Sequence, residues 1–282
     1  MKVLVTGAKG LLGHDIVQFL ESQGTEFYGL DRQMLDISDM DKTAEFIRNY
    51  LPSVVIHCAA FTNVDKAESH EAQCRLINVD ATANIAKVCK EINAKLVYIS
   101  TDYVFSGEEK IPYEVYSKTK PLSVYGQTKL DGEIEVLQNV EKHFIIRTSW
   151  SFGVNGNNFV STMLKLSENQ GKINVVADQI GSPTFTEDLA MLIVEMIKTE
   201  KYGVYHVTNE GFCSWAEFAT EIFRQAGYST TVNFIKSSEY PTIVKRPSYS
   251  NLSKATLDHA GFGRLPTWQD ALGRYLNKIG IS

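Results

Sequence analysis

Tyr125 and Lys129 could together carry out proton-transfer chemistry. Residues four positions apart share one face of an α-helix, so the lysine ammonium would lie beside the tyrosine phenol. A free phenol has a pKa of about 10 and is a weak acid at neutral pH. We expect the nearby positive charge to favour the phenolate and so to prepare Tyr125 for proton exchange with a carbonyl or alcohol oxygen.

The same spacing occurs a second time, at Tyr116 and Lys120. Pro121 follows Lys120 and biases that lysine away from helical geometry. Residues 125–138 contain no proline, and apolar residues recur there at helical spacing. We therefore expect Tyr125 and Lys129 on a helix and Tyr116 in a loop.

The first residues predict a dinucleotide site. A short apolar strand at residues 2–6 and a helical pattern at residues 12–20 flank the glycines Gly7, Gly10 and Gly13. These suit, respectively, a tight turn, close approach of backbone to phosphate, and close packing of helix on sheet. A pyrophosphate binds at the N-terminus of such a helix. The spacing is G-x-x-G-x-x-G rather than G-x-G-x-x-G.

The second expected strand, residues 26–30, is followed by Asp31 and Arg32. A carboxylate at this position can accept hydrogen bonds from the adenosine ribose hydroxyls. The guanidinium of Arg32 could instead accept a 2′-phosphate. The expected cofactor is therefore NADPH or NADH.

Apolar strands and helical patterns alternate and predict an α/β fold with a Rossmann-type doubly wound parallel sheet. The other expected strands are residues 53–58, 95–100, 143–148, 172–177 and 204–208, and the other expected helices are residues 40–50, within 74–91, from 125, 159–168, 186–198, 215–226 and 268–279. We interpret residues 65–68 as a solvated turn before a helix, and the segment after Pro247 as a polar linker. Residues 1–150 would form the NAD(P)-binding domain, and residues 151–282 mainly a smaller substrate-binding lobe, part of which rejoins the first domain.

Thr101 follows the strand expected at residues 95–100, where its hydroxyl could hold a substrate oxygen. With Tyr125 and Lys129 it suits hydride transfer, in which a nicotinamide supplies the hydride and Tyr125 supplies or removes the proton. Lys129 could also hydrogen-bond the nicotinamide ribose. The sequence contains no G-x-S-x-G, H-E-x-x-H or Walker phosphate loop.

The composition is that of a soluble globular protein, with 282 residues, 44% apolar content and a formal charge of -5. No dense Lys/Arg run suggests nucleic acid or an anionic membrane as partner. Residues 189–197 are too short to span a bilayer, and residues 3–5 lack the apolar core of a signal peptide, so we expect a cytoplasmic protein. The four scattered cysteines and His57 are interpreted as structural.

These motifs resemble the extended short-chain dehydrogenase/reductase family, whose paired signatures T-G-x-x-G-x-x-G and Y-x-x-x-K occur at residues 6–13 and 125–129. Within that family the chain is similar to the dTDP-4-dehydrorhamnose reductases over nearly its whole length, at residues 59–68, 100–105, 147–150, 158–159, 178–184 and 246–247. The resemblance implies reduction of the C4 ketone of dTDP-4-dehydro-L-rhamnose with NAD(P)H to dTDP-L-rhamnose, a precursor of cell-surface polysaccharide.

The resemblance also implies roles for individual residues. Thr101, Tyr125 and Lys129 would be catalytic, and Asp102 and Trp150 would contact the sugar. Besides the residues already named, those expected at the cofactor are Leu11, Leu12, Ala60, Phe61 and Thr62. Asn158 and Arg246 are predicted at the substrate diphosphate, since an amide and a guanidinium suit phosphate oxygens.

Some relatives in this family are metal-bridged dimers that use acidic residues. Asp15 and Glu187 could correspond, but Lys278 lies near the position where a further carboxylate would be needed. We therefore expect no metal, and either a monomer or a homodimer.

Two other kinds of protein resemble the same pattern. Sibling 4,6-dehydratases carry an acidic pair after the threonine, whereas Tyr103 follows Asp102 here, and nucleotide-sugar epimerases are longer and have a serine-containing segment. The regulatory subunit of methionine adenosyltransferase is a non-catalytic, NADP-binding alternative. Retention of Thr101, Tyr125 and Lys129 favours catalysis.

Overall fold

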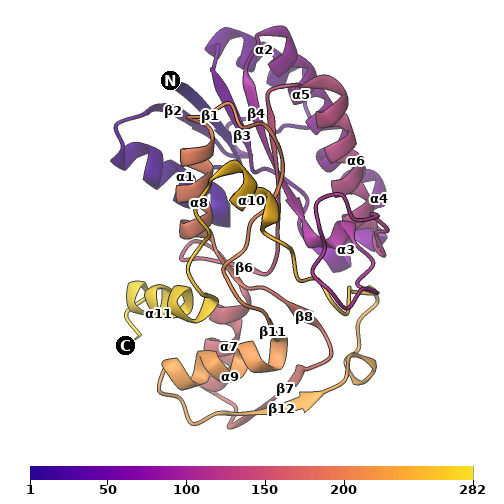
Figure 1. Cartoon of the computed structure of the whole chain (residues 1–282), viewed down its shortest axis with the longest axis vertical. Coiled ribbons are helices and arrows are strands. Elements are labelled where there is room, and N and C mark those ends of the chain that lie inside the picture. Colours follow the sequence, from indigo (N-terminus) through magenta and orange to yellow (C-terminus); the bar gives the residue numbers. More distant parts are fainter. Residues whose placement is uncertain (282) are drawn as a thin grey trace.

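The computed structural model describes residues 1–281, and its larger part is built on a six-stranded sheet (Figure 1). The strands run parallel in the order β10-β5-β4-β3-β1-β2. They are β1 (Lys2–Thr6), β2 (Glu26–Leu30), β3 (Val54–His57), β4 (Lys95–Thr101), β5 (His143–Thr148) and β10 (Gly203–His206). The strand order reverses beside β1, which creates the crevice where such sheets bind ligands. The predicted Rossmann-type α/β fold is confirmed.

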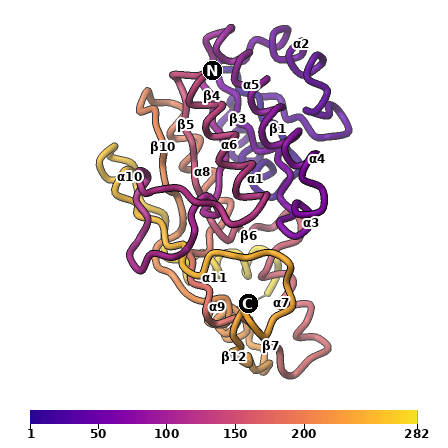
Figure 2. Tube along the Cα trace, turned by 90° about the vertical axis from the view of Figure 1, so that its right-hand side faces the viewer, coloured from indigo at the N-terminus to yellow at the C-terminus, as the bar shows by residue number. Residues whose placement is uncertain are grey.

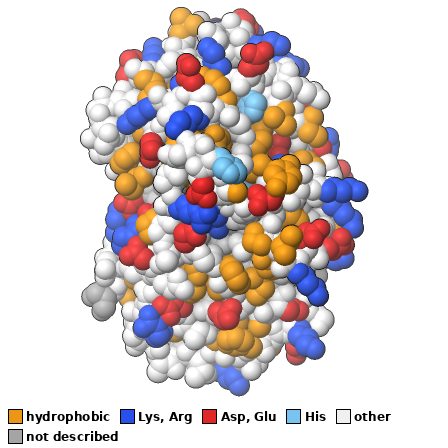
Figure 3. All heavy atoms as spheres, in the orientation of Figure 1, with side chains coloured by type: hydrophobic (Ala, Val, Ile, Leu, Met, Phe, Trp, Pro, Cys, Tyr) orange, Lys and Arg blue, Asp and Glu red, His pale blue; other side chains and the backbone are white. Residues whose placement is uncertain are grey.

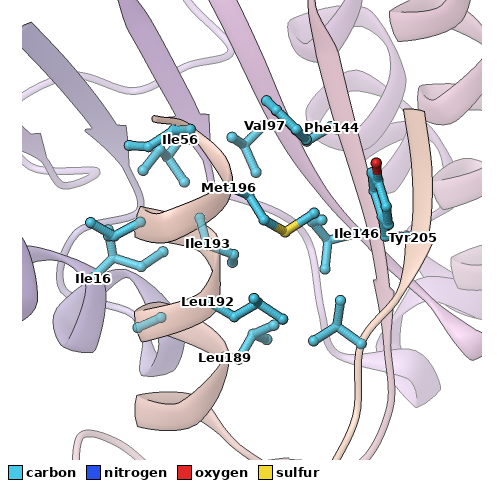
Figure 4. Packing of buried hydrophobic residues seen from close by; sticks show 14 of the residues in the cluster. Ile16, Ile56, Val97, Phe144, Ile146, Leu189, Leu192, Ile193, Met196 and Tyr205 are labelled. Carbon is cyan, nitrogen blue, oxygen red and sulfur yellow. The ribbon is translucent and has the colours of Figure 1, made fainter. Parts of the chain in front are cut away.

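One face of the sheet is covered by α1 (Leu11–Ser22) and α8 (Thr186–Met196). Figure 4 shows side chains of these helices against those of the central strands; Ile16, Leu189, Ile193, Ile56, Val97 and Phe144 are among them. Burying each such side chain contributes about 1.5–3 kcal/mol. Helix α8 is thereby fixed on the sheet although it comes from the second half of the sequence.

The opposite face is covered by α2 (Met40–Tyr50), α5 (Ala81–Glu91) and α6 (Val124–Asn139). Residues 65–68 lie in helix α3 (Val64–Ser69) rather than in a solvated turn, because Asn63 accepts a hydrogen bond from the Lys66 amide and caps that helix. Helix α4 (Glu71–Arg75) then leads through a π-helical turn, Leu76–Asp80, into α5. The helix expected within residues 74–91 therefore begins earlier and changes its winding.

The smaller lobe lies below the sheet in Figure 1. It contains α7 (Phe159–Ser167), α9 (Trp215–Gln225), α11 (Trp268–Lys278) and a parallel pair, β7 (Lys172–Val176) with β12 (Thr231–Ile235). Its core is rich in aromatic residues, with Phe152, Phe185, Phe218 and Trp268 buried together. The sequence predicts neither β12 nor the two-residue strands β6 (Ser151–Phe152), β8 (Ile180–Gly181), β9 (Thr184–Phe185) and β11 (Cys213–Ser214). A strand of only two residues is too short to show an alternating hydrophobic pattern in the sequence.

A segment near the end of the chain returns to the sheet before α11. Helix α10 (Ala255–Ala260) falls in the segment expected to be a polar linker and lies beside β10 in Figure 2. Its Leu257 joins the core that α1 and α8 share with the sheet.

Acidic and basic side chains are interspersed over the face drawn in Figure 3. No helix within residues 1–281 has the length and apolar character needed to cross a bilayer.

Candidate active site

A cleft of about 830 Å³ lies at the carboxyl ends of the strands, between the sheet and the smaller lobe. The predicted site residues that line it are Gly7, Gly10, Leu11, Leu12, Gly13, Asp31, Arg32, Ala60, Thr62, Thr101, Asp102, Tyr125, Lys129, Trp150 and Arg246. Phe61 and Asn158, which were also predicted, do not belong to this lining. Residues far apart in sequence thus surround one cavity.

The glycine turn brings backbone close to backbone. Gly7 adopts a left-handed conformation (φ +68°), and a Cβ there would lie 2.7 Å from the Ala59 nitrogen. A Cβ on Gly13 would lie 2.2 Å from the Gly7 oxygen. Gly10 caps α1 without a side chain, so the first amides of that helix stay accessible from the cleft. This cradle fits a pyrophosphate.

Asp31 lies at the adenosine end expected for such a cleft. Its Oδ1 accepts hydrogen bonds from the amides of Gln33 and Met34, at 2.8 and 3.0 Å, and its Oδ2 pairs with Lys9. The hydrogen bond from Lys9 is the main cause of a lowered pKa of Asp31. Lys9 was not predicted, although a basic residue inside the glycine turn was a visible signal. Arg32 is paired with Asp36 at 3.1 Å.

Helix α6 positions the proposed acid. The Ser123 hydroxyl accepts a hydrogen bond from the Gly126 amide and starts the helix, which places Tyr125 in its first turn. Burial raises the pKa of Tyr125, and interaction with the Thr101 side chain partly offsets this. The pKa of Tyr125 is thus raised, whereas Lys129 was expected to lower it, because the effect of burial dominates. Tyr125 is therefore a phenol at neutral pH and holds a proton to donate.

Lys129 is almost fully buried, and its Nζ lies 3.9 Å from the centroid of the Tyr98 ring. Burial lowers the pKa of Lys129 to about 7, against the opposing effect of Glu133. Tyr103, which also lines the cleft, packs edge-on against Tyr125 with ring centroids 5.6 Å apart. Tyr103 and Tyr98 thus pack around the reacting residues of α6, which face the cleft.

Asp102 is a buried carboxyl beside the Tyr125 and Thr101 pair. Its Oδ1 accepts a hydrogen bond from the Thr101 hydroxyl at 3.1 Å, and its Oδ2 has no partner among the described residues. Burial raises the pKa of Asp102 to about 6. A buried, unsatisfied acceptor is costly and suits a ligand hydroxyl that could satisfy it.

Three aromatic side chains, Trp150, Phe159 and Trp215, form part of the cleft lining. The rings of Trp150 and Trp215 stack with centroids 3.5 Å apart, and Phe159 packs on Trp215 at 4.5 Å. Trp150 has a left-handed backbone (φ +48°), which is strained for a non-glycine residue. Gly181 makes room for it, because a Cβ there would lie 2.5 Å from the indole. Sequence reasoning missed Trp215.

Arg246 and Asn158, both predicted at the diphosphate, have different surroundings. Arg246 lines the cleft and donates a hydrogen bond to Asp65 at 3.0 Å. The Asn158 side chain is engaged in capping α7, because it accepts from the Ser161 amide and donates to the Gly153 oxygen. Its neighbour Asn157 lines the cleft instead.

The loop after β3 is held by a residue that sequence reasoning missed. The Phe61 amide donates to the side chain of Asn78 at 2.8 Å, and the same side chain donates to the Phe61 oxygen at 3.2 Å. Asn78 lies in the π-helical turn and is buried. It thereby fixes the backbone between the cleft residues Ala60 and Thr62.

The acidic residues considered for a metal are engaged with other groups. Asp15 accepts a hydrogen bond from the Thr186 hydroxyl, and Glu187 forms an ion pair with Lys278 at 2.7 Å. No group of three or more potential metal ligands occurs within residues 1–281.

Comparison with known proteins identifies the family to which a chain with this site belongs. The chain matches the RmlD substrate binding domain family over residues 1–281. It is 40% identical to the spore coat polysaccharide biosynthesis protein SpsK of Bacillus subtilis, covering 98% of this chain and 97% of that one. It is 39% identical to a dTDP-4-dehydrorhamnose reductase of Aggregatibacter actinomycetemcomitans, covering 96% and 97%. The crystal structure of dTDP-4-dehydrorhamnose reductase from Bacillus anthracis in complex with NADP superposes with a TM-score of 0.96 at 40% identity, covering 98% and 99%.

Proposed function

We propose that the chain, which belongs to the RmlD substrate binding domain family, is a reductase. It reduces the C4 ketone of dTDP-4-dehydro-L-rhamnose with NADPH or NADH to give dTDP-L-rhamnose. The observation that carries the proposal is the single cleft that joins the glycine turn and Asp31 to Thr101, Tyr125 and Lys129. The chain is an NAD(P)H-dependent oxidoreductase, and dTDP-L-rhamnose would serve polysaccharide biosynthesis.

The residues of the cleft have separable tasks in this reaction. When bound, the nicotinamide supplies the hydride. The turn from Gly7 to Gly13 would hold the pyrophosphate, Asp31 the adenosine ribose and Lys129 the nicotinamide ribose. Tyr125 holds the proton that its hydroxyl donates to the C4 oxygen, and the Thr101 hydroxyl orients that oxygen.

The remaining lining groups would bind the sugar nucleotide. The unpartnered Oδ2 of Asp102 would accept a hydrogen bond from a sugar hydroxyl, and Trp150 would pack against the ring. Arg246 would meet the diphosphate at the mouth of the cleft. We keep Asn158 as a predicted diphosphate contact, which requires its amide to exchange its bond to the Gly153 oxygen for phosphate.

A direct assay tests the proposed reaction. We expect the purified protein to oxidise NADPH or NADH, followed by absorbance, when enzymatically generated dTDP-4-dehydrorhamnose is added. A protein that binds cofactor normally but oxidises none of it would refute the reductase proposal. That same outcome is the one expected of a non-catalytic regulatory subunit.

Replacing Asp31 by asparagine should shift coenzyme preference toward NADPH. The carboxylate accepts from the ribose 2′-hydroxyl of NADH and repels the 2′-phosphate of NADPH. Loss of a hydrogen bond to a charged group costs about 1.5–3 kcal/mol, so kcat/KM for NADH should fall about tenfold or more. The two affinities, titrated by fluorescence, should show the same shift: the ratio of NADPH affinity to NADH affinity should rise. An unchanged ratio would remove the ribose role assigned to Asp31.

Activity should fall as the pH drops through about 6. Burial raises the pKa of Asp102 to about 6, so its carboxylate is present above that pH and is lost below it. Because protonation removes a sugar-binding acceptor, kcat/KM for the sugar nucleotide should fall about tenfold per pH unit below pH 6. In Asp102→Asn this acid limb should vanish from a generally weaker profile. If the variant keeps the limb, another group causes it.

We further infer a cytoplasmic location and either a monomer or a homodimer. The expected location follows from the soluble cofactor and nucleotide-sugar substrate of the proposed reaction. Light scattering at several protein concentrations separates the two oligomeric states.

A further inference from the structure

Glu133 is a buried carboxylate on the same face of α6 as the reacting residues. It follows Lys129 by four residues and Tyr125 by eight, so the three side chains lie in successive turns of one face. Its side chain is 1% exposed. It does not line the cleft, so it would touch neither cofactor nor substrate.

Two strands fix the Glu133 carboxylate. Oε1 accepts hydrogen bonds from the Ser100 hydroxyl at 2.5 Å and from Nε of Arg147 at 2.9 Å, and Oε2 accepts from Nη2 of Arg147 at 2.7 Å. Arg147 also donates to the Val115 oxygen at 2.9 Å. A carboxylate that accepts three such bonds is held in one orientation.

Packing alone does not explain this buried pair. A buried ion pair is costly to desolvate, and apolar residues of similar volume often replace one without loss of stability. This pair connects α6 to β4 and β5, the strands that carry Thr101 and Thr148 into the cleft. An ion pair buried at this place, directly behind the reacting residues, therefore points to a role for its charge.

The other titratable groups around Lys129 are neutral at pH 7. They come from β3, the segment after it, α4, β4 and α6 itself, and are His57, Cys58, Cys74, Tyr98 and Tyr125. Burial lowers the pKa of His57 to about 3 and raises the pKa of Cys58 to about 12. Burial also raises the pKa values of Cys74, Tyr98 and Tyr125. Glu133 is the carboxylate whose charge acts on Lys129, and Arg147, which belongs to β5, is bound to that carboxylate.

We propose that Glu133 is a positioning residue of the reductase: its fixed, buried charge keeps Lys129 as an ammonium, the form that can hydrogen-bond the cofactor ribose and support Tyr125. Ser100 and Arg147 hold the carboxylate in place for this task. The role of Lys129 rests on the proposed function, whereas the charge coupling between the two side chains does not.

The coupling is measured directly in the cofactor-free protein. The side-chain nitrogen of Lys129, labelled with ¹⁵N and assigned with Lys129→Arg, should titrate near pH 7 in the wild type. In Glu133→Gln it should titrate at least about one unit lower, which is a tenfold change in the ratio of ammonium to amine. The alkaline limb of kcat/KM should move by the same amount. An unmoved titration would overturn the proposal even if the protein is a reductase.

Matched variants separate charge from folding. Glu135→Gln makes the same chemical change two residues further along α6, on another face, and should leave the Lys129 titration unmoved. Glu133→Gln strands a buried guanidinium and could unfold the protein. The double variant Glu133→Gln/Arg147→Met removes both charges and should fold with the same lowered titration. Wild-type titration in a folded double variant would also refute the proposal.

Discussion

Tyr125→Phe should lose about 10²–10⁴-fold in kcat while binding NADPH with nearly wild-type affinity, because it removes a general acid and little else. Burial raises the pKa of Tyr125, so the phenol carries its proton throughout the neutral range and is well placed to donate it. Phenylalanine fills the same volume and keeps the edge-on packing with Tyr103. Turnover with the 4-keto sugar and cofactor titration by fluorescence test the two halves of this expectation.

Tyr116→Phe is the matched control for that experiment. Tyr116 has the same spacing to a lysine, but it lies in an exposed turn outside the cleft, as predicted from Pro121. We expect this variant to be fully active. A Tyr125→Phe enzyme with near wild-type turnover would mean that another group supplies the proton.

The parts of the site that could be predicted are those marked by neighbouring residues in the sequence, such as a proline, a helical period or the end of a strand. The proline after Lys120 and the period of residues 125–138 are sufficient to choose Tyr125 over Tyr116. The place of Asp31 in the cleft could be predicted because it directly follows a strand that comes after a glycine turn and helix. The fold follows from the same regular alternation of short strands and helices.

The parts that sequence could not reveal depend on contacts between distant residues. Trp150 stacks on Trp215, and Arg147 holds Glu133, through a tertiary arrangement that no spacing encodes. The pKa of Tyr125 is set by burial, which Lys129 at helical spacing does not disclose. Asn158 shows a different problem, since an amide suits both phosphate and a helix cap, and Ser161 three residues later signalled the cap.

This distinction bears on the three glycines, for which sequence suggests three reasons and the structure gives three environments. Gly7 has the left-handed backbone of the turn, and Gly13 lies against the Gly7 oxygen. At Gly10 an added Cβ would meet only that oxygen, at 3.1 Å, and Gly10 lines the cleft. We therefore expect a substitution at Gly13 to lower both stability and cofactor affinity, and one at Gly10 to lower mainly cofactor affinity.

Gly13→Ala should lower both stability and cofactor affinity. The added methyl would lie 2.2 Å from the Gly7 oxygen, so α1 must move away from β1, at a cost of about 1–3 kcal/mol for overpacking. The displaced helix N-terminus would no longer direct its amides at the pyrophosphate, and NADPH should bind about tenfold to a hundredfold more weakly. Thermal unfolding and fluorescence titration of NADPH measure the two effects.

Two further glycines make this expectation specific. Gly10→Ala should keep nearly wild-type stability yet weaken NADPH binding, because its methyl enters the space where phosphate approaches. Gly171→Ala, at a position with open space around it and no left-handed backbone, should change neither property. If Gly13→Ala melts and binds NADPH like Gly171→Ala, the close packing of α1 on the turn does not build the cofactor cradle. If Gly10→Ala binds NADPH normally, the phosphates approach the chain elsewhere, and the assignment of the glycine turn must be abandoned.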